Sequence, residues 1–130
     1  MSCDDDKNAY AVTAWGPIAW HHLHTVGFAF PKNPTFDERE NMKLFVRYFA
    51  KTLPCEECRV NFEDIIFKTF KDVHVKNCDI LSRYLFFAHN LVNKKLGKKV
   101  IPNTKYEDVR DYYQSMRHLA TSTKIKLILN

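Results

Sequence analysis

A chain of 130 residues is long enough for one domain with its own hydrophobic core. Its three glycines and five prolines leave few breaks in the hydrophobic pattern, which favours long helices over a turn-rich β fold. The formal net charge of +5 is modest and does not by itself predict binding to nucleic acid. No apolar run is long enough to span a membrane, and the acidic start does not resemble a secretory signal, so we expect a protein made in a cytosol.

The first two predicted helices lie before residue 54. Apolar residues recur at helical spacing over roughly 15–30, and Pro31 ends this helix. The second helix follows Thr35, which has the capping-box partner Glu38 three residues later. Pro54 ends this second helix. Both helices have one apolar stripe, as expected of helices that pack on a shared core.

Three further helices are predicted after residue 54. The third begins with a pair of cysteines, and the fourth is capped by Asn77 or Asp79 and stopped by Gly97. A short fifth helix follows Thr104 and Glu107, a second capping-box pattern. The chain is therefore predicted to be all-α, a four-helix bundle with a short fifth helix on one end. We expect a flexible acidic N-terminus at residues 1–11, one domain at residues 12–118 and a C-terminal tail at residues 119–130.

Cys55 and Cys58 are the most informative pair of residues. Two cysteines three positions apart can close into a reversible disulfide, and a helix N-terminus stabilises the thiolate that forms when it opens. The same pair, together with His74 and Cys78, also has a spacing close to that of a zinc module. A continuous amphipathic helix over 59–70 favours the redox interpretation, and a zinc-stabilised binding module is the alternative. A thioredoxin-like protein would need strands around the pair, and none is predicted.

A second group of residues lies on the first helix, in the run Trp-Gly-Pro-x2-Trp-x2-Leu-His. Trp20 and His24 are four residues apart and share a helix face, so a flat aromatic ligand could lie against them. Trp15 precedes them, and Gly16 permits close backbone approach. The alternative is that both tryptophans belong to the core and that His24 is a satisfied interior histidine.

A third group of residues ends the fourth helix. His89, Asn90 and Asn93 could stack on and bond a heterocycle, and Lys95 and Lys98 could meet a diphosphate. The alternative is an exposed polar helix end whose lysines complement the helix dipole. Together the three groups predict FAD beside a dithiol. Because the dinucleotide motif G-x-G-x-x-G is absent, the cofactor would be held between helices.

These three motifs, in this order and spacing, resemble those of the Erv/ALR sulfhydryl oxidases over roughly residues 12 to 116. The resemblance implies an FAD enzyme that oxidises protein dithiols to disulfides and reduces O₂ to H₂O₂. It implies that Cys58 abuts the flavin and that Cys55 exchanges with substrate. The cofactor residues that it implies are Trp15, Gly16, Trp20, His24 and Cys58, adenosine contacts at His89, Asn90 and Asn93, and phosphate-side Lys95 and Lys98.

The chain also departs from the cellular members of that family. Their structural disulfide would fall at Phe86 and Asn103 here, so it is missing. Cys3 and Cys78 are incidental free thiols, or Cys3 acts as a lone relay or pairs with Cys78 or with another chain. This pattern is similar to the compact forms of large DNA viruses, which implies a disulfide pathway for virion proteins in the host cytoplasm or virion. The mitochondrial intermembrane space is the alternative location. The implied partners are a dithiol protein or a small redox protein with a cysteine pair, O₂, and a second copy in a homodimer.

Overall fold

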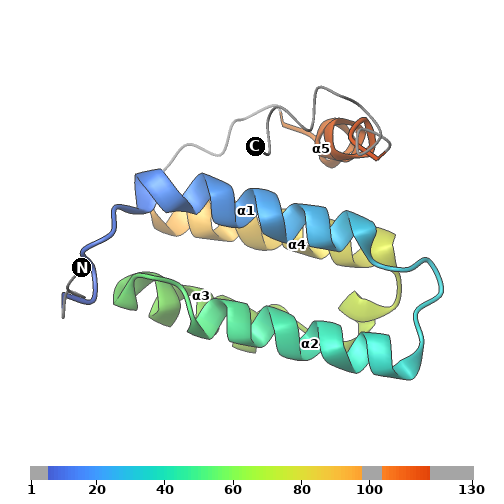
Figure 1. Cartoon of the computed structure of the whole chain (residues 1–130), viewed down its shortest axis with the longest axis horizontal. Helices are drawn as coiled ribbons and strands as arrows, with labels where there is room; N and C mark the ends of the chain where they lie inside the picture. Colours follow the sequence, from blue (N-terminus) through green and yellow to red (C-terminus); the bar gives the residue numbers. More distant parts are fainter. Residues whose placement is uncertain (1–5, 98–103, 118–130) are drawn as a thin grey trace, which may run out of the picture. The chain divides into compact units, whose positions relative to one another are not determined.

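The computed structural model describes residues 6–97 and 104–117, and every regular element in these ranges is helical. The predicted all-α fold is confirmed (Figure 1). The helices are α1 Val12–Ala29, α2 Phe36–Lys51, α3 Glu56–Thr69, the short 3₁₀ helix η1 Asp72–Val75, α4 Cys78–Lys95 and α5 Tyr106–Gln114.

The chain divides into two compact units, residues 1–100 with helices α1 to α4 and residues 101–130 with α5. In the first unit α1 packs mainly on α4 and α2 on α3, while α3 also contacts α4 (Figure 1). Leu23 of α1, Val46 of α2 and Leu85 of α4 are fully buried where these helices meet. Burial of such side chains is the main stabilising contribution to the bundle.

Gly27 is a point of close approach between α1 and α4. A Cβ atom on this residue would lie 2.8 Å from Leu85 Cδ1 and 3.4 Å from Ser82 Oγ. Leu85 is fully buried and cannot easily move away. The missing side chain of Gly27 therefore sets the distance between the two helices.

The helix ends follow the sequence signals in most places. Thr35 caps α2 by accepting a hydrogen bond from the Glu38 backbone N–H (3.1 Å), and Glu38 Oε1 accepts one from the Thr35 N–H (2.9 Å). Asn77, one of the two predicted caps of α4, accepts from the Ile80 N–H at 2.9 Å. Gly97 has φ +68°, a left-handed conformation that favours glycine after a helix.

Two predicted helix starts were wrong. Helix α1 begins at Val12, three residues before the predicted start, because the Ala11 carbonyl already accepts from the backbone of residues 14 and 15; Pro17 therefore lies inside the helix. Helix α5 is capped by Lys105 without a side-chain hydrogen bond, so Thr104 lies one residue too early to close the predicted capping box.

The predicted domain limits stay a prediction, and the tail 119–130 lies outside the described residues. Within the described ranges no helix combines the length and the apolar character needed to cross a membrane.

Candidate functional site

Cys55 and Cys58 form a disulfide at the first turn of α3. Their Cα atoms are 5.2 Å apart, within the range that a disulfide requires. Cys55 is the N-cap of the helix, and its Sγ accepts a hydrogen bond from the Cys58 backbone N–H at 3.2 Å. The turn before it is held by Arg59, which donates to the Leu53 carbonyl at 2.6 Å. A thiolate formed at Cys55 would meet the positive end of the helix dipole.

Three aromatic side chains from α1 and α4 meet next to this region. The rings of Trp20 and His89 are stacked, with centroids 4.0 Å apart and planes 7° from parallel. His24 Nε2 and His89 Nδ1 lie 2.9 Å apart and share a hydrogen bond whose direction depends on the tautomers. The structure therefore brings Trp20 and His24 of α1 into contact with His89 of α4. The sequence predicted these three site residues on two separate helices.

Phe62 connects the disulfide helix to these aromatic residues. It is buried on α3, one turn after Cys58, and its ring centroid lies 5.4 Å from that of Trp20. The site residues predicted from the sequence do not include Phe62. Its position four residues after Cys58 is the signal that could have indicated its place in the site.

His24 is buried, and its environment disfavours the charged form. Burial, followed by the nearby His89 and His21, lowers the pKa of His24 from 6.5 to about 4. His24 is therefore neutral near pH 7. The hydrogen bond that the neutral His24 imidazole shares with His89 holds both rings in place.

The polar residues at the end of α4 differ in their contacts. The half-buried side chains of Asn90 and Asn93 make no hydrogen bond to any other residue that the structure describes. Lys95 forms an ion pair with Asp64 of α3 at 3.4 Å, and Lys68 shares the same carboxylate at 3.1 Å. The hydrogen bond from Lys68, followed by that from Lys95, holds the pKa of the Asp64 carboxyl below its usual range. Lys98 lies outside the described residues.

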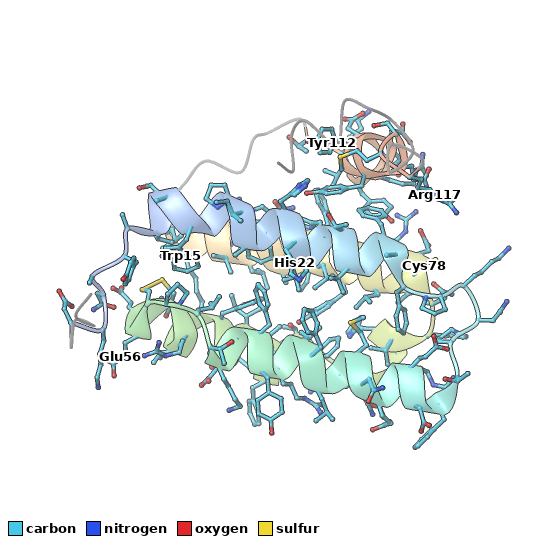
Figure 2. All side chains as sticks on the ribbon, viewed as in Figure 1. Trp15, His22, Glu56, Cys78, Tyr112 and Arg117 are labelled. Atoms are coloured by element: carbon cyan, nitrogen blue, oxygen red, sulfur yellow. A yellow bond between two sulfur atoms is a disulfide. The ribbon has the colours of Figure 1, made fainter. Side chains whose placement is uncertain are left out.

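Trp15 and Gly16 lie at the start of α1. The Trp15 indole Nε1 donates to the Tyr10 carbonyl at 3.0 Å, and its ring packs against the core. A Cβ atom on Gly16 would lie 3.4 Å from Val12 Cγ2, with no other described atom within 4 Å outside its own helical turns. Protein packing thus leaves space beside Gly16. Figure 2 shows Trp15 and Glu56 at the end of the helices where the disulfide is drawn in yellow.

The four alternative zinc ligands are not brought together. His74 Nδ1 accepts a hydrogen bond from the Lys71 N–H at 2.9 Å, and its ring stacks on Tyr84 with centroids 4.4 Å apart. Cys78 is a free thiol at the first residue of α4, and Figure 2 places it at the other end of the helices from Trp15. In residues 6–97 and 104–117 no three histidine, cysteine or acidic side chains form a group suited to a metal ion.

The remaining sequence predictions concern thiols and a missing disulfide. Phe86 is half-buried on α4, and its place as the counterpart of a structural cysteine stays a prediction. Asn103 and Cys3 lie outside the described residues.

The fold and the site together define a class of all-helical proteins with a disulfide at the first turn of a helix. The chain belongs to the Erv1/Alr family, whose model matches residues 17–113. It is 36% identical over 83 residues to the mitochondrial FAD-linked sulfhydryl oxidase ERV1 of Saccharomyces cerevisiae, covering 64% of this chain and 43% of that protein. It is 30% identical over 102 residues to the FAD-linked sulfhydryl oxidase of African swine fever virus, covering 78% and 82%.

A solved structure agrees with these relationships. The crystal structure of the FAD binding domain of Erv1 from Saccharomyces cerevisiae matches with a TM-score of 0.68 and 30% identity, over 82% of this chain and 93% of that one. The chain spans 43% to 51% of the length of the plant and yeast relatives that it matches.

Proposed function

We propose that this chain is an FAD-dependent thiol oxidase. It forms disulfides in protein substrates and passes the electrons through Cys55 and Cys58 to flavin and then to O₂, giving H₂O₂. The observation that carries the proposal is the Cys55–Cys58 disulfide at the first turn of α3, on a helix whose Phe62 packs against Trp20 of α1. The names of the viral and yeast relatives, FAD-linked sulfhydryl oxidases, support the same activity.

The side chains between α1 and α4 fit a flat heterocyclic cofactor. Trp20 and His89 offer ring faces, Asn90 and Asn93 offer amides, and space remains beside Gly16. Lys95 could reach a phosphate only by leaving Asp64. When bound, FAD accepts two electrons from the dithiol and delivers them to O₂. The residues that we propose to hold it are Trp15, Gly16, Trp20, His24, Cys58, His89, Asn90, Asn93, Lys95 and Lys98.

The exchange steps follow from the position of the two cysteines. A substrate thiolate attacks Cys55 Sγ, breaks the bond to Cys58 and releases the Cys58 thiolate, which leaves substrate and Cys55 in a mixed disulfide. A second substrate thiolate attacks the substrate sulfur of that bond and releases Cys55. The substrate leaves as a disulfide, and the chain holds the two electrons as a dithiol.

The hydrogen-bonded pair of His24 and His89 has a positioning part in this proposal. Their shared hydrogen bond fixes the imidazole that stacks on Trp20. Burial lowers the pKa of His24 to about 4, so His24 itself adds no charge to the site near pH 7.

One spectrum and two variants test the function. The purified chain should be yellow with flavin absorption, and Cys58→Ala should abolish dithiol-dependent H₂O₂ production. Cys78→Ala is the matched control, because this thiol lies on another helix outside any disulfide, and it should keep the activity. A colourless protein with one bound zinc would contradict the proposal and support the metal-stabilised binding module.

We further propose that the substrate is a dithiol protein or a small redox protein with a cysteine pair. We also propose that the chain forms a homodimer. The dimer predicts a mass near twice 15.4 kDa in light scattering. A disulfide pathway for virion proteins, in the host cytoplasm or the virion, is supported by the viral relative. The yeast mitochondrial relative supports the alternative, the intermembrane space.

A further inference from the structure

The segment before α1 is bonded to the residue that follows Cys55. The Glu56 backbone N–H donates to Asn8 Oδ1 at 3.0 Å and to the Lys7 carbonyl at 3.2 Å. Lys7 Nζ also lies 3.5 Å from Glu56 Oε1. We name this set of contacts between residues 7–8 and Glu56 the clasp. It joins two parts of the chain that are 48 residues apart.

Both ends of the segment are anchored. Asn8 bonds to α3, and two residues later the Tyr10 carbonyl accepts from Trp15 of α1. The backbone of Asn8 is itself fixed by a bond from its N–H to Asp6 Oδ1 at 2.9 Å. The clasp therefore ties the first turn of α3 to the start of α1, close to the disulfide.

The clasp and the disulfide restrain the same helical turn independently. The first N–H groups of a helix have no partner within the helix. In α3 the Cys58 N–H is satisfied by Cys55 Sγ, whereas the Glu56 N–H is satisfied by the clasp. Opening the disulfide removes its covalent restraint and leaves the donor and acceptor groups of the clasp chemically unchanged.

We propose that Asn8 is a positioning residue for the thiol–disulfide exchange of Cys55 and Cys58. It holds the first turn of α3 in the conformation of the disulfide while both thiols are free. The inference rests on the proposed function only in taking this pair as the redox-active one. A turn held in this way keeps the two sulfurs at high effective concentration, so the clasp favours the disulfide over the dithiol.

The test is a redox equilibrium with glutathione. In it, the protein dithiol and glutathione disulfide give the protein disulfide and two glutathione thiols. The whole 130-residue chain as purified, without oxygen and in a Cys3→Ser, Cys78→Ala background, leaves Cys55 and Cys58 as the reactive thiols, and alkylation followed by mass measurement counts them. Asn8→Ala should lower the equilibrium constant about three- to tenfold, the range produced by one lost hydrogen bond. This corresponds to about 14 to 30 mV toward easier reduction.

Two matched variants separate positioning from a general loss of stability. Asn8→Asp keeps an oxygen acceptor at the same place and should restore the equilibrium constant. Asn33→Ala changes an exposed loop asparagine without a hydrogen bond to the described residues, and it should leave the constant unchanged. Amide exchange of Glu56 in the reduced protein should become faster in Asn8→Ala and return to the original rate in Asn8→Asp.

An unchanged equilibrium constant in Asn8→Ala, with faster Glu56 exchange, would overturn the inference. So would an equal shift in Asn33→Ala. These measurements need no O₂ consumption. If the protein has no oxidase activity but its equilibrium constant with glutathione still depends on Asn8, the proposed function alone is refuted. An active oxidase whose constant ignores Asn8 would refute the inference alone.

Discussion

The buried imidazole of His24 predicts a loss of stability in acid. Its pKa falls from 6.5 to about 4 in the fold, mainly through burial. Between these two values the unfolded chain binds a proton that the folded chain does not, so stability is complete above pH 6.5 and decreases as the pH falls. About 3 kcal/mol of the free energy of unfolding should be lost by pH 4, at about 1.4 kcal/mol per pKa unit. Urea unfolding from pH 7.5 to 4 measures this loss.

A matched pair of variants isolates the contribution of His24. His24→Gln removes the titration while an amide can still bond His89, so its stability should depend less on pH. His22→Gln changes an exposed histidine on the same helix and should keep the full pH dependence. Equal slopes for the two variants would refute the assignment.

Gly16 makes a second prediction at the scale of one residue. Alanine there should raise helix stability by up to about 1 kcal/mol, because its Cβ would meet only Val12 Cγ2, at an acceptable distance. The same methyl group would occupy the space that we assign to the cofactor. Thermal unfolding of the flavin-free protein should therefore be unchanged or improved while the Kd for FAD rises. An unchanged Kd would remove Gly16 from the site.

Spacing along a helix could predict part of the site. Trp20 and His24 are four residues apart, so one face had to carry both. The stack of Trp20 on His89 and the ion pair of Asp64 with Lys95 could not be predicted, because each joins two helices. Such contacts depend on how the helices are rotated about their axes, and the hydrophobic stripe fixes this rotation only coarsely.

At the scale of the helices, the contact of α1 with α4 depends on Gly27. Gly27→Ala should lower the free energy of unfolding by about 1 to 3 kcal/mol, because its Cβ would overlap Leu85 Cδ1 in a closed core. Thermal or urea unfolding measures the change. Leu85→Val removes the overlapping atom, so in the double variant the penalty of the alanine should disappear. Additive losses would show that the contact is not the cause.

Helix existence was predicted better than helix ends. The Thr35 capping box and Gly97 are local signals, and both mark real ends of helices. The early start of α1 was missed because residues 12–14 have no side-chain cap before them, and the bonds to the Ala11 carbonyl involve the backbone alone. A proline six positions into a helix also argued for a later start.

At the scale of the whole molecule, the core predicts that the bundle folds before it binds its cofactor. Fully buried side chains of α1, α2 and α4 belong to one hydrophobic core. Removing FAD should therefore leave a cooperative unfolding transition. A hundredfold excess of FAD over its Kd should add about 2.7 kcal/mol, which raises Tm by roughly 10 °C. Differential scanning calorimetry measures both forms.

A chelator is the control for this experiment. EDTA should leave Tm unchanged, whereas a zinc-stabilised module would unfold as its metal is removed. A fall in Tm with EDTA and no response to FAD would favour the metal interpretation.

The positions of the tryptophans have a practical consequence. The chain has two, Trp15 at the anchored segment and Trp20 on the ring of His89. Intrinsic tryptophan fluorescence therefore originates beside the candidate site. Replacing Trp15 by phenylalanine would leave emission from Trp20 alone, and replacing Trp20 would leave that of Trp15. The protein thus contains two optical probes, one for the segment before α1 and one for the contact between α1 and α4.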